Sequence, residues 1–216
     1  MPVKLSSTGG GSVTLTTPST ATDYTATFPA NTGNVETDSA TQTLTNKTLT
    51  SPVITGASVS SMASSVITSG TSQASTSGTS IDFTGIPSWV KRITVMFNGV
   101  STNGTSPVIV QLGTGATPTY TTSGYQSFVL YNGGTTNITN GLTTIGIGAS
   151  DTRWGSMILS TSGSNSWTEI VGNAVGTNGG AGGGGITLGA ALTAIRITTS
   201  NGTDAFDAGS INILYE

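Results

Sequence analysis

The chain has 216 residues, of which only 7% are charged, and its net charge is −3 at pH 7. Histidine and cysteine are both absent, which excludes disulfides, thiolate nucleophiles, histidine-based general base catalysis and zinc sites of the usual ligand sets. The six basic residues are scattered and no apolar run approaches the roughly 20 residues that span a bilayer, so we expect no nucleic-acid partner and no membrane insertion.

Small residues dominate the composition. Gly, Ser and Thr together make up 103 of the 216 positions. Gly and Ser at this level are common in disordered chains, but threonine is β-branched and favours strands, and the large apolar residues are spaced singly among polar ones. The composition therefore predicts an all-β protein with a short elongated part.

Residues 1–37 are predicted to form a small N-terminal β cap. Val13 and Leu15 alternate with threonines, and Tyr24, Ala26 and Phe28 alternate again after a turn. Because an isolated hairpin is marginally stable in water, we expect the cap to dock on another protein or on copies of itself.

Residues 38–78 are predicted to form a trimeric shaft. Their large apolar residues recur every five positions, and Pro52 excludes a regular helix through the run. One chain cannot bury such a stripe, whereas three chains around one axis can pool it into a shared core, which predicts a homotrimer. The predicted core residues are Leu44, Leu49, Ile54 and Val59. A flexible linker is the alternative, as is a short helical turn over residues 60–68.

Residues 79–216 carry dense strand signals separated by Asn-Gly dipeptides, which favour tight hairpin turns. Such spacing predicts an antiparallel β-sandwich, jelly-roll-like, as the C-terminal domain. The predicted strands are 80–84, 91–98, 108–113, 125–131, 142–148, 156–160, 166–172, 186–188, 192–199 and 210–215.

Several segments resemble fibre proteins of tailed bacteriophages. TQTLTNKTLTSPVITG is similar to a shaft segment of tail and head fibres, and GSVTLTTPSTATDYTATFPANTGNV resembles the cap that often precedes it. The segments TSIDFTGIPSWVKRITVMFNGVSTNGTS and LTAIRITTSNGTDAFDAGSINILYE resemble the start and end of a terminal domain of such fibres. The least familiar part is residues 114–185.

The resemblance implies a homotrimeric virion protein, made in the host cytoplasm, without a cofactor. Its N-terminal part would attach to other virion proteins of the tail or capsid, and its C-terminal domain would face outward. The expected function is non-enzymatic adhesion to a host-surface polysaccharide or envelope protein. The alternatives are a capsid-mounted head fibre with a structural role and, less in keeping with the short chain, a polysaccharide-cleaving spike.

Aromatic rings and flexible loops are the candidate receptor contacts. Sugar recognition uses rings against sugar faces, which points to Trp154, Tyr120 and Tyr125, the two tyrosines being expected at the surface. Trp89 and Trp167 are weaker candidates, Trp89 being expected to pack inside. The run Asn178–Gly185 lacks the Lys-Ser/Thr of a phosphate loop and is predicted to be a flexible tip loop, with Gly180 and Gly183 as recognition positions.

The acidic residues give weaker hypotheses. Asn201, Asp204 and Asp207 could hold a calcium ion, although turn capping or ion pairing is the default interpretation. As paired acids for glycoside cleavage, the candidates are Asp82, Asp151, Glu169, Asp204 and Asp207.

Overall fold

The computed structural model describes residues 3–6, 8–15, 48, 50, 67–146, 148, 149 and 151–216. Two compact units divide the chain, Met1–Ala57 and Ser58–Glu216. The predicted shaft core residues Leu44, Leu49, Ile54 and Val59 lie outside the described residues, as do Tyr24, Ala26 and Phe28 of the predicted cap.

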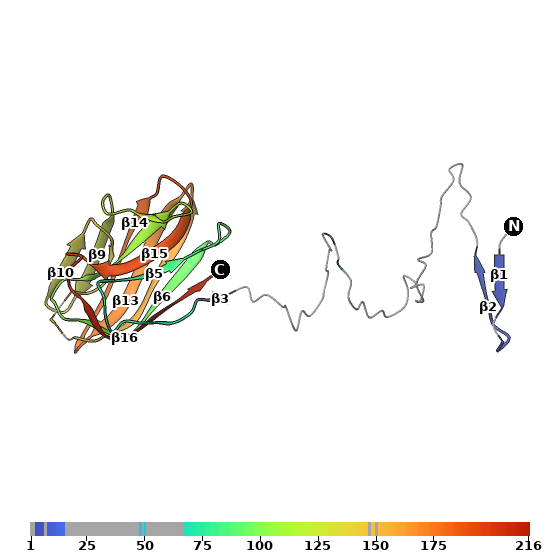
Figure 1. Cartoon of the computed structure of the whole chain (residues 1–216), viewed down its shortest axis with the longest axis horizontal. Coiled ribbons are helices and arrows are strands. Elements are labelled where there is room, and N and C mark those ends of the chain that lie inside the picture. The colour runs from blue at the N-terminus through green and yellow to red at the C-terminus, as the bar shows by residue number, and fades with distance from the viewer. Residues whose placement is uncertain are drawn as a thin grey trace. The chain divides into compact units, whose positions relative to one another are not determined.

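The described strands of the N-terminal unit form an antiparallel hairpin, drawn in blue in Figure 1. Strand β1 (Val3–Ser6) pairs with β2 (Ser12–Leu15) through a glycine-rich turn in which Gly10 has a φ of 83°. Such a positive φ suits glycine, which has no Cβ to clash. The predicted strand at Val13 and Leu15 is therefore confirmed, with Val3–Ser6 as its partner.

The C-terminal unit is built from two antiparallel sheets (Figure 1). The larger sheet has the strand order β10-β9-β14-β13-β12-β6-β16-β3, with β4 also paired to β16. Its strands are β3 (Thr68–Ser69), β4 (Gln73–Ala74), β6 (Arg92–Thr102), β9 (Gln126–Tyr131), β10 (Gly134–Ile138), β12 (Arg153–Gly163), β13 (Ser166–Val175), β14 (Asn178–Thr187) and β16 (Phe206–Tyr215). The smaller sheet has the order β11-β7-β15-β5, with β8 paired to β7. Its strands are β5 (Ser80–Thr84), β7 (Val108–Thr114), β8 (Thr119–Tyr120), β11 (Leu142–Thr143) and β15 (Leu192–Thr199).

The two sheets share one hydrophobic core. Val95 and Phe97 of β6 and Met157 of β12 belong to the same buried cluster as Val110 of β7 and Ile197 of β15. Strand β13 shows why this packing follows from sequence, since alternate residues from Trp167 to Val175 are buried and those between them are exposed. Side chains on a strand point alternately to its two faces, so one face of each sheet packs inward. The all-β sandwich prediction is confirmed at this level.

All ten predicted strands have observed counterparts, and the ranges predicted for β5 and β15 match the structure. The prediction that Asn178–Gly185 is a flexible loop is wrong, because these residues form most of β14. The sandwich also begins earlier than predicted, since β3 and β4 pair with β16. Ser75 is fully buried there and its hydroxyl donates to the Ala208 carbonyl at 2.8 Å.

Candidate functional site

The outer face of the larger sheet carries most of the exposed large apolar side chains. The strand register places Phe128, Gly183, Ile170 and Ile158 in one row across four neighbouring strands. Ile170 is 68% exposed, the largest fraction among the exposed large apolar side chains. An apolar side chain this exposed at the centre of a sheet is a sign of a contact surface rather than of a solvated one.

Five apolar residues on this face form what we call the apolar stripe. They extend across β13, β12, β6 and β16, and the register joins Ile170 to Ile158, Ile158 to Thr94 and Thr94 to Leu214. Trp154 is 53% exposed, with its ring lying over Gly99. None of the stripe residues is charged; they are Met96, Trp154, Ile158, Ile170 and Leu214.

The glycine strand β14 lies beside the stripe and forms the floor of a groove. It pairs with β13 on one side and β9 on the other. Because Gly183 has no side chain, the surface drops between Ile170 and Phe128. Two adjoining hollows of about 600 and 480 Å³ share Gln126 and Gly185. These hollows are called the glycine groove below.

The side chains around the glycine groove are neutral. Phe128 contributes an aromatic ring that is 36% exposed, and Gln126 and Asn137 contribute amides on exposed positions of β9 and β10. Within the described part of the chain, neither amide makes a side-chain hydrogen bond. Thr139 and Thr168 add hydroxyls. The groove therefore offers free neutral donors and acceptors beside an apolar ring.

Only glycine fits several positions of β14. A Cβ at Gly182 would lie 2.0 Å from the Phe128 carbonyl oxygen, and one at Gly184 would lie 2.3 Å from the Gln126 carbonyl oxygen. Neighbouring backbone thus occupies the space that a side chain would need. Gly180 faces inward, where a Cβ would meet Ile145 at 2.6 Å. Of the two glycines proposed as recognition positions, Gly183 lines the groove and Gly180 does not.

A buried carboxylic acid lies behind the glycine strand. Glu169 is 3% exposed, and Ser127 donates a hydrogen bond of 2.7 Å to its Oε2. The Ser127 hydroxyl in turn accepts from the Thr143 amide. Burial raises the pKa of Glu169 from 4.5 to about 8, while the Ser127 hydrogen bond opposes that rise. Glu169 faces the core, so it does not line the glycine groove.

Two further polar side chains are buried between the sheets. Arg153 is fully buried, and its Nε donates to the Ile145 carbonyl at 3.4 Å. Burial lowers the pKa of Arg153, while the charges of Asp151 and Asp207 oppose that change. Neither amide atom of Asn173 has a partner among the described residues. Alternation along β13 places Asn173 on the inward face, but a polar residue type does not by itself indicate burial, so neither residue was singled out from the sequence.

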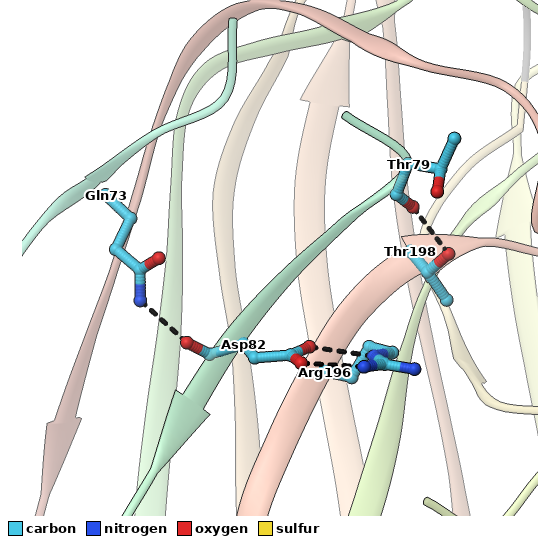
Figure 2. A network of polar contacts seen from close by, with 5 residues as sticks. All are labelled: Gln73, Thr79, Asp82, Arg196 and Thr198. Carbon is cyan, nitrogen blue, oxygen red and sulfur yellow. Dashed lines mark hydrogen bonds and ion pairs between the residues drawn. The ribbon is translucent and has the colours of Figure 1, made fainter. Parts of the chain in front are cut away.

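An ion-pair network lies on the smaller sheet. Figure 2 shows Asp82 of β5 and Arg196 of β15 side by side, with Arg196 donating two hydrogen bonds of 2.8 and 2.7 Å to the carboxylate. Gln73 of β4 donates to the Asp82 carbonyl, which links the larger sheet to the smaller one, and Thr198 of β15 donates to the Thr79 carbonyl just before β5 (Figure 2). Fork-shaped guanidinium-carboxylate pairs of this kind fix geometry.

Tyr120 is part of this network. The Arg196 guanidinium carbon lies 4.1 Å from the centre of the Tyr120 ring. Burial, with the Asp82 charge, raises the pKa of Tyr120 to about 12. The arginine covers one face of this half-buried ring, so that face is not open to a receptor.

The prediction that Tyr125 lies at the surface is wrong, since it is only 1% exposed. Its hydroxyl accepts from the Leu112 amide at 2.8 Å and donates to the Thr121 carbonyl at 3.1 Å, so the phenol satisfies backbone groups of the sandwich. Burial raises the pKa of Tyr125 to about 12. Trp167 is also buried, at 5% exposure, whereas Trp89 packs on Tyr215 with ring centres 5.9 Å apart and stays 53% exposed.

The acidic turn at residues 201–204 is held by its own hydrogen bonds. The Asp204 carboxylate accepts from the Asn201 amide and from the Ser106 backbone, and these bonds lower the pKa of Asp204. Asp207 accepts from the Ser101 hydroxyl. Within the described residues, no group of three or more acidic side chains is placed to hold a metal ion. The turn-capping interpretation accounts for these contacts.

The structure does not bring the candidate acids together at the groove. Asp82 pairs with Arg196 on the smaller sheet, and Glu169 lies in the core. Asp151 accepts from the Gly148 amide, and Asp204 and Asp207 contact the segments around Ser106 and Ser101. The groove residues themselves supply neutral hydrogen-bonding groups and an aromatic ring.

Comparisons of the chain with protein-family models, curated proteins and solved structures found no significant match. Among the described residues, no helix has the length and apolar character needed to cross a membrane.

Proposed function

We propose that the chain is a homotrimeric bacteriophage virion fibre whose C-terminal sandwich contacts the host surface. Residues 1–37 attach it to other proteins of the tail or capsid, and the segment between the cap and β3 forms the shaft. The sequence resemblance to fibre proteins supports this assignment, and the sandwich supplies surfaces suited to both of its requirements, assembly and recognition.

The apolar stripe is the observation that carries the proposal. Ile170 and Trp154 are more than half exposed. Their cross-strand neighbours are uncharged: Ile158 and Gly183 beside Ile170, and Ala174 and Asn98 beside Trp154. Contacts between identical subunits bury apolar centres surrounded by polar rims. The stripe itself carries no charge, and Arg92, on the same face of β6, is paired with Glu216. The stripe residues therefore meet no like-charge repulsion when they pack against their own copy. The stripe therefore fits contact between copies of this chain.

Light scattering on the full chain tests the proposal. One chain has a mass of 21.5 kDa, and the wild-type protein is expected at about three times that value. Replacing Ile158 and Ile170 together by aspartate should shift the mass toward that of one chain, because buried unpaired charge is strongly unfavourable. The matched control is Ala116→Asp at an exposed turn position, which should leave the mass unchanged.

Two results would contradict the proposal. A wild-type mass of 21.5 kDa at micromolar concentration would remove the fibre assignment. An unchanged mass for the double variant, with the control also unchanged, would show that the stripe is not a contact between copies. Binding of the purified protein to host cells then separates an adhesive fibre from one with a structural role alone.

A further inference from the structure

We propose that the glycine groove binds an uncharged polysaccharide chain. This inference rests on the proposed function, because it names the host-surface ligand that the fibre would contact. It concerns a site formed by β9, β10, β13 and β14, next to the apolar stripe and distinct from it. The arguments are the shape of the groove, its chemistry and the way its floor is built.

The groove has the shape of a channel along β14. Neighbouring strands in a sheet lie about 4.8 Å apart, so the backbones of β9 and β13 are separated by about 10 Å across the glycine strand. The β9 side carries Gln126 and Phe128, and the β13 side carries Thr168. Together the two hollows are large enough for several ring-sized groups, because ligand sites commonly measure about 300–1,000 Å³. An elongated ligand fits better than a compact one.

The lining selects against charged ligands. Gln126 and Asn137 present free amides that both donate and accept, which matches the hydroxyls of sugars. Phe128 offers the apolar ring that a sugar face can cover. Among the described residues, no charged side chain lines either hollow. A phosphate, sulfate or uronic acid group would lose its hydration there without gaining a counter-charge.

The floor of the groove excludes a peptide strand as the occupant. An added strand needs free backbone N–H and C=O groups at a sheet edge. Here β14 is fully paired with β13 from Asn178 to Thr187 and with β9 from Gly180 to Gly185. Its backbone hydrogen bonds are therefore already made within the sheet. A ligand lying on this face must be recognised by the side chains on either side of the floor.

The floor is also rigid. Backbone pairing with β13 on one side and β9 on the other holds the strand in place. A ligand consequently meets a preformed surface and loses little free energy in ordering it. Without side chains on the floor, a sugar ring can approach the backbone closely. These properties distinguish β14 from a flexible glycine-rich loop.

Polysaccharide binding by the full chain tests the inference. The probes are a printed panel of neutral plant, fungal and bacterial glycans, with hyaluronan and heparin as acidic members. The wild-type protein should bind at least one neutral member and neither acidic one. Phe128→Ala and the double change Gln126→Ala with Asn137→Ala should each weaken that binding at least tenfold. Thr135→Ala, an exposed position of β10 outside both hollows, should leave it unchanged.

Each other outcome overturns the inference. The inference is wrong if the wild-type protein binds no neutral glycan. It is also wrong if Phe128→Ala and the Gln126→Ala, Asn137→Ala double variant both bind the glycan like the wild type. Preference for hyaluronan or heparin would mean that a charged site lies elsewhere. The proposed function can fail independently of this inference. If the protein has the mass of one chain but still binds a neutral glycan, the fibre assignment is wrong and the groove inference stands. If the protein is a trimer that binds no neutral glycan, the groove inference is wrong and the fibre assignment stands. Unchanged unfolding transitions in the groove variants would show that lost binding is not lost folding.

Discussion

Glu169 is the residue whose ionisation should change the stability of the sandwich most. Its folded-state pKa is raised to about 8, above the value of 4.5 for a free glutamate. The proton is therefore held more tightly in the folded state, and this contribution to stability is fully present below pH 4.5. It decreases as the pH rises from 4.5 to 8, by about 1.4 kcal/mol for each pH unit that separates the two pKa values.

Urea unfolding at pH 5 and pH 8.5 should therefore show a lower free energy of unfolding at the higher pH. Glu169→Gln keeps an acceptor for Ser127 but cannot ionise, so most of that difference should disappear. The matched control is Glu216→Gln, which changes a more exposed carboxyl at the C-terminus and should keep the wild-type pH dependence. An equal pH dependence in wild type and Glu169→Gln would show that the buried carboxyl does not control stability.

Side-chain environment was the part of the candidate site least open to prediction from sequence. Tyr125 and Tyr120 have similar local sequences rich in Thr and Ser, yet one is buried beneath backbone hydrogen bonds and the other stacks on Arg196. Trp154, a candidate receptor contact, is 53% exposed. The amides of Gln126 and Asn137 were missed, because only the pairing of β9 with β10 brings them to the same groove.

At the scale of elements, alternation and turn residues predicted most strands. Asn132-Gly133 connects β9 to β10 as expected, with Gly133 at a φ of 109°. Asn98-Gly99 was expected to be a turn but lies inside β6, where the ladder with β16 is irregular. The glycine run of β14 was misread because no local pattern distinguishes a loop glycine from one required by neighbouring backbone. Only the sheet around it supplies that information.

Alanine substitutions in β14 should distinguish a glycine that neighbouring backbone requires from one that could carry a side chain. Gly182→Ala places a methyl group 2.0 Å from a backbone oxygen and should lower the free energy of unfolding by about 1–3 kcal/mol or more. Gly179→Ala, on the same strand, meets nothing within 4 Å. It should be neutral or stabilising by a few tenths of a kcal/mol to about 1 kcal/mol, because alanine restricts the unfolded chain. Chemical unfolding measures both, and equal effects would mean that β14 tolerates side chains throughout.

At the scale of the whole molecule, we expect the sandwich and the proposed shaft to differ in where their order comes from. The sandwich has a continuous core of its own, which includes Phe97, Met157 and Ile197. The segment with the five-residue apolar repeat has no comparable core in its sequence, and we expect it to gain order through assembly. All three tryptophans, Trp89, Trp154 and Trp167, belong to the C-terminal unit, so their fluorescence reports on that unit alone.

This division predicts that assembly can be weakened without unfolding the sandwich. Leu49→Asp should place three like charges at the shared axis of the shaft, and the concentration at which the oligomer dissociates should rise at least tenfold, because each buried charge costs several kcal/mol. The adjacent Thr50 is exposed, so Thr50→Asp is the matched control and should dissociate like the wild type. Sedimentation measures the size of the oligomer, and tryptophan fluorescence reports whether the sandwich stays folded. If Leu49→Asp dissociates while its tryptophan fluorescence stays like that of the wild type, the sandwich does not depend on assembly for its folding. If the oligomer of Leu49→Asp is unchanged, this leucine does not lie at the shared axis.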